Sequence, residues 1–190
     1  MRLSPYVMTR IALFTALCVA AAVLFRFGSS IVPFSLVPFV VFLTGFLLSP
    51  FEAFLSMFLY VLLGLLGLPV FATPPFGGPL YVLRPTFGFL LGFVLAAPCI
   101  ALLGRGKTPR HVLQAVLVGM AIIYLPGLLY FFFAMNVLLG KPVSFQDTLK
   151  IAFLPFIGPD FVKAFLAYFL ARQVLLRLER MRLGRMSAAR

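Results

Sequence analysis

The chain has 190 residues, of which 63% are hydrophobic and 11% are charged, and its formal net charge is +12 at pH 7. So few charged side chains cannot cover the surface of a water-soluble globular protein. The composition therefore predicts an all-α integral membrane protein. Its single domain covers residues 1–190 and has about six spans of roughly 20 residues each. The basic residues lie in short connections and at the chain ends without a basic, aromatic-lined surface, which argues against a nucleic-acid partner.

Charged residues divide the chain into long uncharged stretches. No formally charged residue occurs between Arg26 and Glu52, between Glu52 and Arg84, or between Arg84 and Arg105. Because a charge inside the bilayer is costly, each stretch holds one span, alone or with an irregular segment. We predict spans near residues 8–26, 33–49, 51–67, 86–104, 112–138 and 150–178, with a tight turn at Ser49-Pro50 between the second and the third.

The first span carries small residues at regular helical spacing, Ala12, Ala16 and Ala20. Its outline, with Arg2 and Arg10 ahead of an apolar run, resembles a secretory signal, but the regular stripe favours a permanent member of the bundle. Small residues let helices approach closely. Two interpretations of the stripe stay open: contact within this bundle, or docking of a separate membrane subunit.

The segment 68–84 contains four prolines and the pair Gly77-Gly78, which exclude a regular helix. We therefore predict a loop here. Tyr81 in this loop and Tyr124 in the fifth span are candidate ligand contacts, because each combines an apolar ring with a hydroxyl. Arg84, at the end of the loop, has two interpretations: it meets an anionic substrate, or it extends to the membrane interface.

The last span contains an acid and a base in an apolar stretch, in the run Gly158-Pro159-Asp160-Phe161-Val162-Lys163. Asp160 and Lys163 lie one helical turn apart, and ionisable side chains at membrane depth indicate functional sites. A carboxylate accepts N–H bonds from a urea-like group and an ammonium bonds a carbonyl or carboxylate, so the pair suits a small polar solute. The alternative is an ion pair that only fixes helix packing. We predict that Pro159 occupies the first turn of a half-helix that starts inside the membrane.

Lysine and arginine are distributed unevenly between the two sides of the predicted bundle. One side collects the basic residues of the N-terminus, the 105–110 connection and the tail 172–190, whereas the other side has only four. Basic residues concentrate on the cytoplasmic side. We therefore predict a multi-pass cell-membrane protein, surrounded by lipid, with both termini in the cytoplasm and Asp160 toward the outside.

No catalytic or metal-binding constellation is found in the sequence. Gly106-Lys107-Thr108 ends like a phosphate-binding loop, but Ala101 stands where the first glycine belongs, and a membrane span precedes it. His111 lies at the predicted cytoplasmic border, and Cys18 and Cys99 have no partner motif. The sequence therefore predicts no catalytic residues, no metal and no cofactor.

Three blocks occur in a specific order: Leu-Gly-Leu-Pro-Val-Phe-Ala at 66–72, Pro-Thr-x-Gly at 85–88 and Gly-x-Asp-x-x-Lys at 158–163. With weaker matches at 33–38 and 124–127, they make nearly the whole chain resemble the BioY family, the biotin-binding S components of energy-coupling-factor (ECF) importers. The chain departs from the family after Pro38, where polar residues are usual, and at Phe87, where glycine is usual.

The resemblance implies a six-transmembrane-helix bundle of the ECF S-component type. It also implies high-affinity binding of biotin and uptake with a transmembrane coupling subunit and two ATPase subunits. Asp160 and Lys163 then contact the biotin head group, the loop 69–84 caps the substrate, and the alanine stripe of the first span faces the coupling subunit. The departures leave lipoate, or a related carboxylate cofactor or precursor, as an alternative substrate.

The expected mechanism is capture from outside, closure of the loop 68–83 over the ligand, and release inward when ATP-driven partners reorient the bundle. Two other classes of protein are alternatives. A membrane-embedded enzyme needs a nucleophile and base or a metal cluster, and a purely structural subunit binds no small ligand. A direct binding measurement distinguishes a receptor from both.

Overall fold

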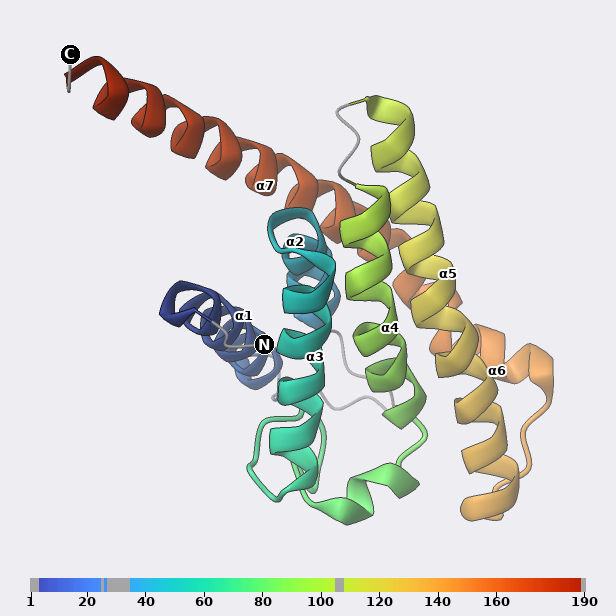
Figure 1. Ribbon diagram of the computed structural model, residues 1–190. Helices are drawn as coiled ribbons and strands as arrows, with labels where there is room; N and C mark the ends of the chain where they lie inside the picture. Colours follow the sequence, from blue (N-terminus) through green and yellow to red (C-terminus); the bar gives the residue numbers. More distant parts are fainter. Residues whose placement is uncertain (1–3, 25, 27–34, 105–107, 189–190) are drawn as a thin grey trace.

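The computed structural model describes residues 4–24, 26, 35–104 and 108–188, with side chains as far as residue 181. Within these residues the chain is helical and has no strand. The start of the predicted second span and the basic residues at 105–107 lie outside the described part. In chain order the elements are α1 (Pro5–Leu24), α2 (Val37–Leu47), α3 (Pro50–Leu65), the 3-10 helix η1 (Pro79–Leu83), α4 (Phe87–Leu103), α5 (Pro109–Phe133), the π-helix η2 (Ala134–Leu138), α6 (Phe145–Ala152) and α7 (Leu154–Ala188) (Figure 1).

Three helical segments in the described residues are long and apolar enough to cross a membrane: Pro5–Leu24, Pro109–Leu138 and Leu154–Met181. The apolar helices α2, α3 and α4 are shorter, with 11, 16 and 17 residues. A helix rises about 1.5 Å per residue, so 11 residues cover about half of a hydrocarbon core roughly 30 Å thick. The structure thus has the all-helical, apolar character that the composition predicts, whereas length alone identifies three spans.

The centre of the bundle is the contact between α4 and α5, which lie side by side (Figure 1). Gly92 of α4 permits this contact, because a Cβ atom there would stand 2.7 Å from the carbonyl oxygen of Ile123. Helices α2 and α3 pack against α4, and α7 packs against α2. Close approach through small residues is how helices associate where no water drives them together.

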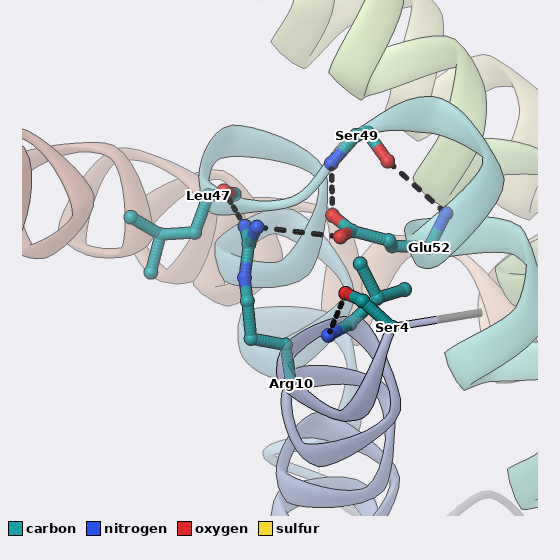
Figure 2. Close-up of polar contacts among 6 residues, drawn as sticks. Ser4, Arg10, Leu47, Ser49 and Glu52 are labelled. Atoms are coloured by element: carbon teal, nitrogen blue, oxygen red, sulfur yellow. Dashed lines mark hydrogen bonds and ion pairs between the residues drawn. The ribbon is translucent and has the colours of Figure 1, made fainter.

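The tight turn between α2 and α3 is stabilised at the N-terminus of α3. Ser49 caps this helix: its hydroxyl accepts the Glu52 N–H, and the Glu52 carboxylate accepts the Ser49 N–H at 2.8 Å, which forms a capping box. Arg10 of α1 donates to the same carboxylate at 3.3 Å and to the Leu47 carbonyl at 2.9 Å (Figure 2). One side chain of α1 therefore holds the end of α2 and the start of α3 together.

The connection between the fifth and the last predicted spans is partly helical. It contains most of α6, and the Ser144 hydroxyl caps this helix by accepting the Asp147 N–H at 3.1 Å. That hydroxyl also donates to the Asp147 carboxylate and lowers its pKa, since the bond favours the charged form.

The prediction that Pro159 occupies the first turn of the last half-helix is wrong. The chain is interrupted at Phe153, and α7 begins at Leu154, so Pro155 occupies the first turn while Pro159 lies inside the helix. A proline in the first turn removes no helical hydrogen bond, because the N–H groups of the first turn have no acceptor within the helix. The half-helix therefore starts several residues earlier than predicted, and Asp160 lies within it.

Candidate functional site

Asp160 and Lys163 form a buried ion pair in the first half of α7. The Lys163 Nζ atom lies 2.7 Å from Asp160 Oδ1, and each residue is 6% exposed. Their spacing places both side chains on one face of the helix. A buried pair of charges needs further hydrogen bonds, because desolvation of the two ions is otherwise uncompensated.

Two other elements supply those hydrogen bonds. The Tyr124 hydroxyl of α5 donates to Asp160 Oδ2 at 2.8 Å, and Lys163 Nζ donates to the Ser35 carbonyl, just before α2, at 2.8 Å. Both oxygens of the carboxylate thus accept a bond from the protein. The pair connects the α2, α5 and α7 regions at one point.

Tyr124 is held by aromatic neighbours on both sides. Its ring meets Phe89 of α4 and Phe153 edge to face, with ring centroids 5.8 and 5.2 Å apart. Phe153 stands at the interruption between α6 and α7. The helix break therefore brings an aromatic ring against Tyr124, and this contact helps to direct the hydroxyl at Asp160.

The ion pair and Tyr124 line a cavity inside the bundle. The space open to the centre of a water molecule is about 90 Å³, compared with roughly 10–15 Å³ for one water. The polar residues of the lining include Tyr60, Tyr81 and Thr86 besides Tyr124, Asp160 and Lys163. The apolar lining comes from residues of several helices, including Val37, Pro38, Leu90, Phe93, Ile123 and Phe156. A mostly apolar cavity with a few convergent polar groups is typical of a small-molecule site.

The segment 68–84, here called the cap, covers part of this cavity through Ala72 and Tyr81. Phe71 anchors it: the ring is fully buried and packs on Tyr60 and Tyr81, with centroids 5.7 and 4.2 Å apart. Gly64 of α3 makes room for that ring, since a Cβ atom there would lie 2.0 Å from Phe71 Cζ. The cap is therefore fitted into the end of α3.

The structure brings together four of the predicted ligand contacts. Asp160, Lys163, Tyr81 and Tyr124 all line the cavity. Arg84 does not: it is exposed at the end of η1, between the lining residues Tyr81 and Thr86. The stripe residues Ala12, Ala16 and Ala20 are exposed on the face of α1 that points away from the bundle.

Sequence reasoning missed several residues of the site. The Ser35 carbonyl is a backbone group, which no side-chain pattern reveals. Tyr60 lies in an apolar helix that also contains three phenylalanines, and Phe71 is one of 24 phenylalanines in the chain, so residue type marks neither of them. Thr73 had no signal either, and its hydroxyl lies 2.7 Å from the Tyr81 hydroxyl. Only the contacts that these residues make in the folded chain identify them.

Comparison with known proteins finds relatives that match along most of the chain. The chain is 38% identical over 167 residues to a probable biotin transporter BioY of Lysinibacillus sphaericus. This alignment covers 86% of this chain and 84% of the relative. It is 34% identical over 175 residues to the biotin transporter BioY of Thermotoga maritima, with coverage of 91% and 95%.

The fold has a counterpart among solved structures. A crystal structure of the S-component for biotin from an ECF-type ABC transporter superposes with a TM-score of 0.70, covering 91% of this chain and 94% of that one at 22% identity. This likeness concerns the fold. The family model described as "BioY family" matches residues 1–180, and the chain belongs to the BioY family.

Proposed function

We propose that this protein is the biotin-binding membrane subunit, or S component, of an ECF-type importer. The observation that carries the proposal is the buried Asp160 carboxylate, which Tyr124 and Lys163 hold in the wall of a largely apolar cavity. The relatives that match most of the chain are named biotin transporters. The protein binds and carries its ligand and performs no chemistry on it.

The hydrogen-bonding capacity of Asp160 suits the ureido head of biotin. A carboxylate offers about four lone-pair positions, and protein donors occupy one on each oxygen. A remaining position accepts one N–H group of a cyclic urea, whose two N–H groups point to opposite sides of its carbonyl. Lys163 beside this position supplies the positive charge that complements the urea carbonyl. The apolar walls then cover the ring sulfur and the aliphatic chain.

Lipoate, the alternative substrate, fits this arrangement less well. Its dithiolane ring has no N–H group, so the remaining acceptor positions of Asp160 would be buried without a donor. A site with buried polar groups discriminates strongly against an analogue that leaves them unpaired. We therefore propose biotin rather than lipoate, although both carry a carboxylate on an aliphatic chain.

The proposed topology is six spans formed by α1 to α5 and α7, with both termini in the cytoplasm. The uneven distribution of lysine and arginine supports this orientation. The exposed basic residues Arg172, Arg177 and Arg180 continue α7 beyond its apolar part on the cytoplasmic side. The cap and the cavity then lie toward the outside, from which the ligand enters.

The proposed partners are a transmembrane coupling subunit and two ATPase subunits, which supply the ATP hydrolysis. The exposed alanines Ala12, Ala16 and Ala20 form a strip of small side chains on the outward surface of α1, beside the exposed Leu13 and Leu17, which supports docking of a membrane helix there. The ligand is captured from outside beneath the cap, and it is released inward when the partners reorient the bundle.

Calorimetric titration of the purified protein with biotin and with lipoate tests the proposed function. We expect sub-micromolar binding of biotin and much weaker binding of lipoate. Absence of sub-micromolar binding for both ligands would refute the receptor function and leave the structural-subunit and enzyme classes. Tight binding of lipoate alone would instead assign the alternative substrate.

Tyr124→Phe is expected to weaken biotin binding about tenfold, because a hydrogen bond to a charged group contributes roughly 1.5–3 kcal/mol and Lys163 still holds the carboxylate. Tyr168→Phe makes the same chemical change on α7 at a residue outside the cavity lining. Titration of both variants checks the prediction. Equal affinities for the two variants would show that the Tyr124 hydroxyl does not prepare Asp160 for the ligand.

Arg84→Gln is expected to weaken binding of biotin about two- to fivefold and to leave binding of neutral biotin amide unchanged. The reason is that Arg84 is exposed at the edge of the cavity, where an ion pair with the ligand carboxylate is screened by water. Titration with the two ligands at low and high salt isolates the charge effect. If the variant binds both ligands more weakly by the same factor, Arg84 does not recognise the carboxylate and instead extends to the membrane interface.

A further inference from the structure

The end of α1 is connected to the cap by the side chain of Arg26. One guanidinium nitrogen, Nη2, donates to the Pro69 carbonyl, and the guanidinium stacks over the Phe76 ring at 4.7 Å from its centroid. Pro69 and Phe76 stand on either side of the cap anchor Phe71. Arg26 therefore contacts the cap at two points that are distant from it in the sequence.

The surroundings of Arg26 differ from those of an arginine that only extends to the water at the membrane interface. An interfacial arginine ordinarily keeps its charged head in water. Here the Arg26 Nε atom is buried and, among the described residues, has no hydrogen-bond partner. A buried donor without a partner is unfavourable. The contacts with the Pro69 carbonyl and the Phe76 ring offset that cost, because a cation is attracted to the face of an aromatic ring.

The part of the cap that Arg26 contacts is continuous with the cavity wall. The Phe71 N–H donates to the Phe76 carbonyl at 2.8 Å, so the two residues are held together. The Phe71 ring packs on Tyr60 and Tyr81, which both line the cavity. A shift of Phe76 would therefore move Phe71, and with it the tyrosines against which a ligand lies.

We infer that Arg26 is a positioning residue that holds residues 69–76 of the cap in place and so slows dissociation of the ligand. The inference rests on the proposed function, because it assigns Arg26 a role in retaining the ligand of that site. Arg26 lines no part of the cavity in the described residues. It acts through the cap, so it affects retention of the ligand rather than recognition of its head group.

The test compares Arg26→Met with Arg110→Met, the same change at an exposed arginine of α5. Displacement of bound biotin by excess unlabelled biotin gives the dissociation rate, and stopped-flow mixing gives the association rate. Loss of the two contacts is expected to raise the dissociation rate of Arg26→Met about tenfold or more, with the association rate within about twofold of wild type. Arg26→Lys keeps the charge beside Phe76, so its dissociation rate is expected to lie between those of Arg26→Met and the wild type. An unchanged dissociation rate in Arg26→Met would overturn the inference.

Amide hydrogen exchange in the ligand-free protein keeps this test separate from the proposed function. The Gly78 N–H donates to the Gly64 carbonyl at 2.7 Å, and the Phe71 N–H is bonded within the cap. Both amides are expected to exchange about tenfold faster or more in Arg26→Met than in Arg110→Met, since local opening of the cap limits their exchange. Unchanged exchange at both amides overturns the inference even if biotin binds. Failure of the wild-type protein to bind biotin refutes the proposed function and leaves this exchange measurement to decide the role of Arg26 in the cap.

Discussion

Asp160→Ala is expected to weaken biotin binding by roughly 30- to 5,000-fold, the range that corresponds to the 2–5 kcal/mol typical for removing one partner of a buried charged contact. The variant removes the proposed acceptor of a ligand N–H group. It also leaves Lys163 buried without its carboxylate and Tyr124 without its acceptor. Titration calorimetry with biotin measures the loss. Asp147→Ala is the matched control, because Asp147 is an exposed acid on α6.

A double variant, Asp160→Ala with Lys163→Met, distinguishes a binding site from a structural ion pair. The double variant also removes the buried ammonium group that Asp160→Ala leaves without its carboxylate. Apolar replacement of a buried pair of charges is often neutral or stabilising. We expect the double variant to regain thermal stability relative to Asp160→Ala without regaining affinity for biotin. If the double variant binds biotin like the wild type, the pair serves only helix packing and the ligand binds elsewhere.

Gly64→Ala is expected to displace the cap and to lower biotin affinity about ten- to hundredfold, because overpacking a well-packed core costs roughly 1–3 kcal/mol. The added Cβ atom would stand 2.0 Å from Phe71 Cζ, and Phe71 is enclosed by Tyr60 and Tyr81. The ring cannot turn away without moving one of those cavity-lining tyrosines. Calorimetry and limited proteolysis of the cap measure the two consequences.

Gly158→Ala is the matched control for this clash. A Cβ atom built at Gly158 meets no heavy atom within 4 Å, so this substitution is expected to leave affinity unchanged. A second comparison places Gly64→Ala in a Phe71→Ala background, where the obstructing ring is absent. The affinity lost through Gly64→Ala should be smaller there, because residues in direct contact are energetically coupled. Equal losses in the two backgrounds would contradict the proposed fit between Gly64 and Phe71.

Sequence patterns indicate where α1 to α5 and the irregular segment 68–84 lie, because those features depend on local chemistry. Apolar runs that end at charged residues lie at the positions of α1 to α5, and the prolines of 68–84 exclude a regular helix there except for the short η1. The spacing of Asp160 and Lys163 predicts a shared helix face, and they pair at 2.7 Å. These predictions required no information about neighbouring segments.

The sequence does not determine the position of the helix break. Pro155 and Pro159 both suit the first turn of a helix, and local preference does not choose between them. The structure begins α7 at Leu154, where Phe153 packs against Tyr124 of α5. A contact with another helix therefore accompanies the break at this position, and no property of the 150–160 segment alone predicts that contact.

The sequence by itself determined the membrane class, the family and the acid-base pair of the last helix, because composition, ordered blocks and one-turn spacing are all properties of the linear chain. Only the tertiary structure decided which groups accompany that pair. Tyr124 and the Ser35 carbonyl come to it from other segments, Phe71 anchors the cap in a space left by Gly64, and Arg84 is exposed outside the cavity wall. The physical reason is that hydrogen bonds and packing join segments that are distant in the chain, whereas the patterns of a sequence record only local preferences.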